Sequence, residues 1–82
     1  QILATPGHTP GSVCIYSKED STLFTGDTLF KDGIGRYDFS YSNKKQLFES
    51  INNLFVTLPD ETLIYPGHGD PSTLGAEQTS HF

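Results

Sequence analysis

The chain has 82 residues, of which 34% are apolar, and ten Asp or Glu against five Lys or Arg give it a net charge of −5. This length suits one small domain with a thin core, spanning residues 1–82. The negative charge argues against nucleic-acid binding, which needs a positive surface to displace counterions. No apolar run approaches the roughly 18 residues of a membrane span, and no signal peptide is visible. Cys14 is the single cysteine, which excludes an internal disulfide and suits a reducing, cytoplasmic compartment.

The first part of the chain predicts three short strands. Residues 1–4 are mostly apolar, and the next segment, 5–11, holds two Pro and two Gly around a histidine and must be a loop. Residues 12–17 alternate between two faces. After a polar turn, residues 22–25 return as the second strand of an antiparallel hairpin. Because the chain begins with Gln1 inside an apparent strand, we expect it to be part of a longer protein.

The middle of the chain predicts one amphipathic helix. Residues 26–42 are rich in Gly, Asp and Tyr without a sustained period, and a long irregular stretch in a small domain is more often functional than idle. Residues 43–58 carry an apolar stripe at helical spacing. Asn43 and Gln46 approximate a capping box at its start, and Pro59 follows its end.

The last part of the chain predicts a buried strand and a short helix. Residues 63–65 are apolar and are stopped by Pro-Gly, and Ser72 or Thr73 can cap a helix that runs through Glu77. The expected order of elements is therefore β-β-β-loop-α-β-α, in one unit without repeats or linkers.

Three residues at predicted strand ends could bind a metal. His8 lies in Thr-Pro-Gly-His-Thr-Pro-Gly, His68 in Tyr-Pro-Gly-His-Gly, and Asp27 in Phe-Thr-Gly-Asp-Thr-Leu-Phe. Proline fixes φ and glycine permits tight turns, so such loops can hold a side chain at a fixed point. Each residue alone is more simply explained as a turn or cap residue. Together, two imidazoles and a carboxylate favour a site for zinc, iron or manganese.

These segments, together with Gly-Ile-Gly-Arg-Tyr-Asp-Phe, resemble the motifs of the metallo-β-lactamase superfamily in their usual order. The resemblance is to the hydroxyacylglutathione hydrolase (glyoxalase II-like) group and covers nearly the whole chain. It implies an α/β fold, a four-layer αββα sandwich built from two similar halves. This chain would be the C-terminal half, with a mixed or antiparallel sheet and helices on one face.

The resemblance also implies a two-metal site. His8 would ligate the first ion, Asp27 would bridge both ions, and His68 would ligate the second. The other ligands would come from a His-x-His-x-Asp-His motif in the N-terminal half of the same domain. The ions would be zinc, with iron or manganese as alternatives. A metal-bridging hydroxide would then hydrolyse a small-molecule thioester such as a hydroxyacylglutathione.

Arg36 is a candidate substrate-binding residue. It lies nine positions after Asp27, where the glyoxalase II-like group carries a basic residue that contacts glutathione. A guanidinium can form paired hydrogen bonds with a carboxylate. A buried structural arginine, bonded to backbone carbonyls, explains the residue equally well.

Two other functions stay open. One is a persulfide dioxygenase-like oxygenase of the same fold, which would use one iron and leave His68 without a ligand role. The other is an inactive folded fragment or assembly module. An isolated half would expose an apolar sheet face and an open strand edge, so we expect the chain alone to self-associate and to lack activity.

Overall fold

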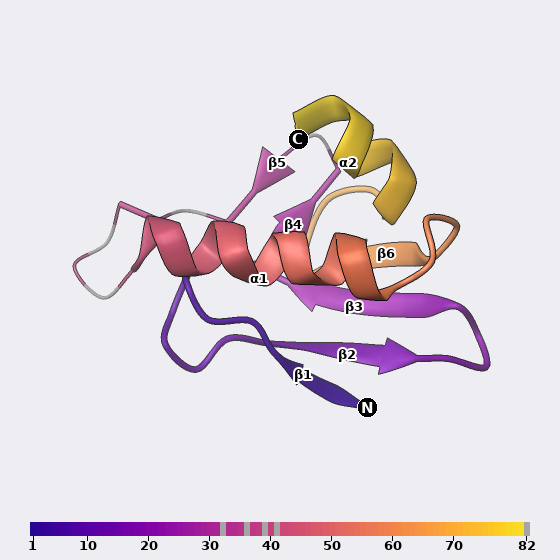
Figure 1. Ribbon diagram of the computed structural model, residues 1–82, viewed down its shortest axis with the longest axis horizontal. Helices are drawn as coiled ribbons and strands as arrows, with labels where there is room; N and C mark the ends of the chain where they lie inside the picture. The colour runs from indigo at the N-terminus through magenta and orange to yellow at the C-terminus, as the bar shows by residue number, and fades with distance from the viewer. Residues whose placement is uncertain (32, 36, 39, 41, 82) are drawn as a thin grey trace.

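The computed structural model describes residues 1–31, 33–35, 37, 38, 40 and 42–81. In this part of the chain, two helices and a small hairpin accompany one five-stranded sheet (Figure 1). The strands of the sheet, in spatial order, are β1 (Ile2–Ala4), β2 (Val13–Ser17), β3 (Thr22–Gly26), β6 (Leu63–Pro66) and β7 (Ser72–Thr73). The hairpin pairs β4 (Leu29–Phe30) with β5 (Gly33–Ile34), and the helices are α1 (Lys44–Thr57) and α2 (Leu74–His81). Neither described helix is long and apolar enough to cross a membrane.

The sheet is mixed, as expected from the resemblance. β1, β2 and β3 are antiparallel neighbours, so that Ile15 pairs with Ile2 on one side and with Phe24 on the other. β6 lies parallel to β3, which is possible because α1 forms the long connection that parallel strands require. β7 then pairs antiparallel with β6. The carboxyl ends of β3 and β6 therefore meet at one edge of the sheet.

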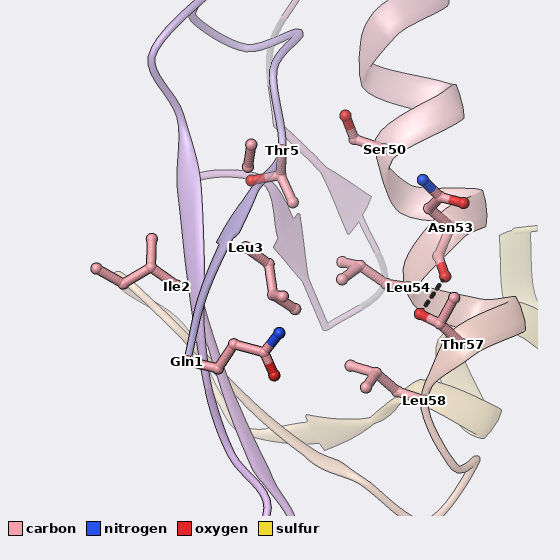
Figure 2. A pocket seen from close by; sticks show the side chains of 10 residues that line it. Gln1, Ile2, Leu3, Thr5, Ser50, Asn53, Leu54, Thr57 and Leu58 are labelled. Atoms are coloured by element: carbon pink, nitrogen blue, oxygen red, sulfur yellow. Dashed lines mark hydrogen bonds between the residues drawn. The ribbon is translucent and has the colours of Figure 1, made fainter.

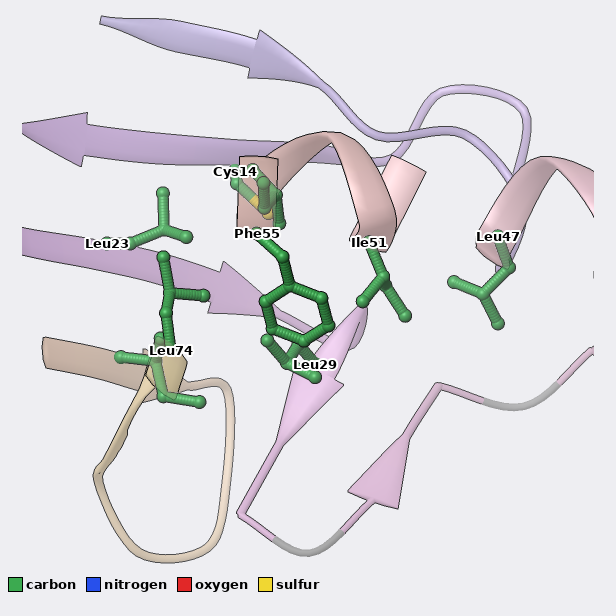
Figure 3. Packing of buried hydrophobic residues seen from close by; sticks show 9 residues of the cluster. Cys14, Leu23, Leu29, Leu47, Ile51, Phe55 and Leu74 are labelled. Atoms are coloured by element: carbon green, nitrogen blue, oxygen red, sulfur yellow. The ribbon is translucent and has the colours of Figure 1, made fainter. Parts of the chain in front are cut away.

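The core lies between one face of the sheet and the helices. On β2, Cys14 is fully buried while its neighbours Val13 and Ile15 are exposed on the other face, as the predicted alternation requires. Figure 3 shows the inward side chains packed under α1. The buried apolar residues are Cys14, Leu23, Leu29, Leu47, Ile51, Leu54, Phe55, Ile64 and Leu74.

Helix α1 begins as predicted but with only half of the capping box. The Asn43 side chain accepts a hydrogen bond from the backbone N–H of Gln46 at 3.0 Å. The backbone N–H of Asn43 donates instead to the carbonyl of Gly7 at 2.7 Å. A tertiary contact has therefore taken the donor that the Gln46 side chain would satisfy in an isolated helix. At the other end, the N–H of Leu58 closes the helix on Leu54 at 3.1 Å.

Two features differ from the expectation. The irregular segment 26–42 contains the β4–β5 hairpin, and Ser72 and Thr73 form the short strand β7. Two-residue strands are too short to show a period of two, so the sequence pattern could not reveal them. Thr73 also has its predicted capping role, because its hydroxyl accepts from the N–H of Ala76 at 3.2 Å. The helix that follows runs on to His81.

The face of the sheet opposite the core is apolar and exposed. Register places Ile2, Ile15, Phe24 and Tyr65 side by side across four strands, and the rings of the last two stack with centroids 5.8 Å apart. This surface, called the apolar sheet face below, consists of Ile2, Val13, Ile15, Phe24, Leu63 and Tyr65.

Candidate metal site

Two of the predicted ligands meet at the carboxyl edge of the sheet. Asp27 follows β3 and His68 follows β6, and these strands are parallel neighbours. Asp27 Oδ1 lies 3.6 Å from His68 Nδ1. Gly67 lies beside this contact, and a Cβ at that position would stand 3.2 Å from the same carboxylate oxygen. The edge where parallel strands end is also where open α/β sheets commonly bind ligands.

The separation of these two atoms suits a shared cation. Donor atoms about 2.0–2.2 Å from one zinc ion, at tetrahedral angles, lie roughly 3.3–3.5 Å from each other. The observed 3.6 Å between carboxylate and imidazole is close to that range. Both side chains are largely exposed to solvent, so an ion can reach them. The pair therefore fits two positions of a metal coordination sphere.

The loop that carries His8 is held by the start of α1. Three consecutive backbone carbonyls of the loop, those of Pro6, Gly7 and His8, accept hydrogen bonds from α1 or from the two residues before it. The three hydrogen bonds are Ser50 Oγ to the Pro6 carbonyl at 2.8 Å, the Asn43 N–H to the Gly7 carbonyl at 2.7 Å, and Ser42 Oγ to the His8 carbonyl at 2.8 Å. Three consecutive anchored carbonyls fix the path of this loop.

Gly7 lets the loop approach the helix closely. Its φ is +141°, and a Cβ added there would stand 2.2 Å from the backbone Cα of Leu47. Gly11, in the same loop, has no heavy atom within 4 Å of such a position. The requirement for glycine therefore applies to the residue immediately before His8.

Gly35 lies against both the His8 loop and the Asp27 loop. Its N–H donates to the carbonyl of Thr28 at 2.9 Å. A Cβ on Gly35 would stand 2.0 Å from the Asp27 carbonyl oxygen and 3.3 Å from His8 Cβ. The structure thus brings the two loops to one place. Among the described residues, however, no three His, Cys, Asp or Glu side chains form a group that could hold a metal, so the convergence of all three ligands stays a prediction.

Phe30 is a site residue that the sequence analysis missed. Its ring lies against the His68 ring, with centroids 4.9 Å apart and planes inclined by 41°. Phe30 belongs to β4, the hairpin strand that begins two residues after Asp27. The contact restricts the orientation of the imidazole beside the Asp27 carboxylate. Phe30 follows Asp27 by three residues in the sequence. This spacing placed it near the aspartate, but nothing in the sequence linked it to His68.

Cys14 lies in the core below the site and is not a ligand candidate. Its thiol contacts the Thr5 hydroxyl at 3.5 Å and the Thr25 carbonyl at 3.9 Å. Burial raises the pKa of the Cys14 thiol above the usual 9.0, although hydrogen bonds with Thr5 and Thr28 act in the opposite direction. The sulfur therefore stays protonated, as expected for the structural cysteine that the sequence predicts.

This raised pKa makes one prediction about stability at alkaline pH. In the unfolded chain Cys14 loses its proton near pH 9, whereas the folded chain retains it, so its contribution to stability is full below pH 9 and falls above it. The difference in unfolding free energy between wild type and Cys14→Ala should shrink by up to about 1.4 kcal/mol per pH unit above 9. Urea unfolding at pH 7, 9 and 10 measures this, and a constant difference would contradict it.

Two hollows lie near these elements. The larger, about 500 Å³, is between β1 and α1 and is lined by residues such as Leu3, Leu54 and Leu58 (Figure 2). His8, Asp27 and His68 do not line it, so this hollow is separate from the predicted metal site. The smaller, about 420 Å³, is lined by Ile34, Gly35, Tyr37 and Asp38. It adjoins the loops that carry His8 and Asp27, called the ligand loops below, because Gly35 borders both of them.

Arg36 lies outside the described residues, so its predicted contact with substrate stays a prediction.

Comparison with known proteins identifies the family of the chain. Residues 1–68 match the family model described as the metallo-beta-lactamase superfamily. The chain is 44% identical to the probable metallo-hydrolase YqgX of Bacillus subtilis, over 95% of this chain and 37% of that protein. It is 42% identical to the hydroxyacylglutathione hydrolase GloC of Haemophilus influenzae, over 99% of this chain and 38% of that protein.

A solved structure gives the same result. The crystal structure of TTHA1623 in a di-iron-bound form superposes with a TM-score of 0.93 at 44% identity, covering 98% of this chain and 40% of that one. The chain thus spans well under half the length of the relatives it matches. It contains part of a metallo-β-lactamase fold, with a mixed five-stranded sheet and two helices in the described residues. By sequence and by structure, the chain belongs to the metallo-beta-lactamase superfamily.

Proposed function

We propose that this chain is the C-terminal half of a metal-dependent hydrolase that cleaves thioesters such as hydroxyacylglutathiones. The observation that carries the proposal is the Asp27–His68 pair, 3.6 Å apart at the carboxyl edge of the sheet. The similarity to a hydroxyacylglutathione hydrolase supports the substrate class. The similarity to a probable metallo-hydrolase supports the type of reaction.

In this proposal Asp27, His68 and His8 hold two divalent cations together with ligands from the N-terminal half. When bound, the cations supply Lewis acidity that activates water near neutral pH and polarises the substrate carbonyl. Zinc suits this donor set, and the di-iron form of the related structure keeps iron as an alternative, with manganese. The chain's own part is to orient the donors. Phe30 packs on the His68 ring, and Ser50 of helix α1 holds the His8 loop through the Pro6 carbonyl.

The contact between Asp27 and His68 favours the hydrolase over a mono-iron oxygenase. In the oxygenase, His68 would have no ligand role, whereas in the hydrolase it would bind the second ion beside Asp27. Here the imidazole is placed against the carboxylate by Phe30 on one side and by the turn at Gly67 on the other.

The smaller hollow is the proposed entrance for substrate. It adjoins Gly35, and Tyr37 forms part of its wall. We propose that the substrate would enter from this side toward Asp27 and His68. Arg36, between these two residues in the sequence, would bind a remote carboxylate of the thiol portion.

Metal analysis and kinetics of the full-length protein that carries this chain test the proposed function. We expect two divalent ions per chain and hydrolysis of a hydroxyacylglutathione that stops when the metals are removed by chelation and returns with zinc, iron or manganese. One iron per chain, with oxygen consumption and no hydrolysis, would contradict the hydrolase and support the oxygenase. Absence of bound metal would support the inactive assembly module.

The apolar sheet face supports a second part of the proposal, namely that this chain docks on the N-terminal half of the same domain. Six exposed apolar side chains gather on it, more than isolated surface residues account for. The N-terminal half would cover them with its own sheet.

For the chain alone we predict self-association through this face. Light scattering should give a mass at or above that of a dimer, because the exposed apolar side chains bury one another. Phe24→Lys should shift the chain toward the monomer, since a charge at the centre of the face opposes burial. Val56, an apolar residue on α1 that is even more exposed than Phe24, supplies the control. A monomeric wild-type chain, or an equal effect of Val56→Lys, would contradict the prediction.

A further inference from the structure

Two buried threonines lie beneath the two ligand loops. Thr5 precedes His8 by three residues, and Thr28 follows Asp27 directly. Each is only 1% exposed. Their hydroxyl oxygens are 3.5 Å apart, and the Thr5 hydroxyl also contacts Cys14 Sγ at 3.5 Å. The side chains therefore link the His8 loop, the Asp27 loop and strand β2 inside the core.

The backbone holds both threonines in place. The N–H of Thr5 donates to the carbonyl of Ser12 at 2.9 Å, which closes the His8 loop. The N–H of Thr28 donates to the carbonyl of Thr25, and the Thr28 carbonyl accepts from Gly35, both at 2.9 Å. A change in the distance between the two hydroxyls must therefore move the loops that carry the ligands.

We infer that Thr28, acting through Thr5, is a positioning residue that sets the separation of the His8 and Asp27 loops for metal binding. The inference deepens the proposed function and rests on it. A hydroxyl pair at 3.5 Å is a long hydrogen bond and weak by itself. Its effect lies in what replacement does: with Val at position 28, the Thr5 hydroxyl keeps only the Cys14 thiol, a weak partner, and we expect the loops to shift in response.

Thr62 provides a matched control within the same chain. It is also 1% exposed, but its hydroxyl has no hydrogen-bond partner among the described residues. It precedes β6, and the next residue, Leu63, bonds to Ser21 in the β2–β3 turn at 2.9 Å. This is the end of the sheet away from Asp27. Removing the Thr62 hydroxyl therefore changes a buried polar atom without touching the ligand loops.

The test compares Thr28→Val, Thr28→Ser and Thr62→Val in the full-length protein, with zinc alone as the probe. Competition with a chromophoric chelator measures the affinity. We expect Thr28→Val to weaken zinc binding by about tenfold, the lower end of the loss that follows removal of a group bonded to a ligand, because Thr28 acts on the loops and not on a ligand side chain. Thr28→Ser keeps the hydroxyl and should stay within about threefold of wild type, and Thr62→Val should bind like wild type.

A second measurement separates this inference from the proposed function. In the metal-free protein, Thr28→Val should shift the backbone amide NMR signal of His8, which is remote from Thr28 in the sequence, whereas Thr28→Ser and Thr62→Val should leave this signal in place. If wild type binds no zinc, the proposed function fails and the amide shifts alone decide the inference. If Thr28→Val does not fold, Thr5→Val and Thr5→Ser make the same comparison.

Two results would overturn the inference. One is a folded Thr28→Val variant, or its Thr5 counterpart, with wild-type affinity and unshifted amide signals. The other is an equal loss of affinity in the Val and Ser variants, since the methyl group would then be the required part and the role would be packing alone.

Discussion

Replacing Asp27 with Ala in the full-length protein is expected to lower kcat/KM by about a thousandfold or more, the largest effect of any single change in this chain. The reason is that Asp27 lies next to the other two predicted ligands. Its carboxylate lies 3.6 Å from the His68 imidazole, and its backbone borders Gly35, which also lies against His8. In the proposed site Asp27 would serve both cations, so its loss should release both.

Metal content decides whether this loss has the proposed cause. Asp27→Ala should retain less than one ion per chain and keep its fold by circular dichroism, because the side chain is largely exposed. Asp20→Ala is the control. This aspartate lies in the β2–β3 turn, where it accepts a hydrogen bond from Ser17 at 2.9 Å, and its replacement should leave metal and rate unchanged. An Asp27→Ala protein with two ions and wild-type turnover would refute the ligand assignment.

Local signals in the sequence were sufficient for most of the fold. The apolar stripe of α1 is buried as predicted, and Asn43 caps the helix through Gln46. The alternation on β2 correctly separated the face of Cys14 from that of Val13. These features follow from hydrophobic periods of 3.6 and 2 residues. Such a period is visible within a single segment of the sequence.

The remaining features depend on contacts between distant segments. No local pattern indicated that the N–H of Asn43 would bind Gly7, or that Phe30 would pack on His68. The Thr5–Thr28 contact joins residues 23 positions apart. Threonines occur in many strands and turns, so their side chains alone gave no reason to connect them.

For the site, the sequence identified residue types but not their assembly. The parallel pairing of β3 with β6 is what brings Asp27 and His68 to one edge. That pairing follows from the α1 crossover, which the predicted order of elements allowed but did not require. The position of the His8 side chain relative to the other two depends on the loop held by α1, and this loop leads to the second large prediction.

Gly7→Ala should destabilise the protein more than any other glycine replacement in the His8 loop. A φ of +141° is unfavourable for a residue with a side chain, at about 1–3 kcal/mol. The added Cβ would also stand 2.2 Å from the Leu47 Cα, and relieving such overlap in a packed region costs about 1–3 kcal/mol more. The sum is a large part of the roughly 5–15 kcal/mol that stabilises a typical folded protein.

Relief of the overlap also predicts a functional consequence. The loop must move away from α1, which would break the bonds from Asn43 to Gly7 and from Ser42 to His8. Zinc affinity should therefore fall together with the midpoint of urea unfolding. Gly11→Ala, in the same loop, meets no atom within 4 Å and should change stability by no more than about 0.5 kcal/mol. If Gly7→Ala unfolded at the wild-type urea concentration, the close packing of the His8 loop on α1 could not be what holds this ligand in place.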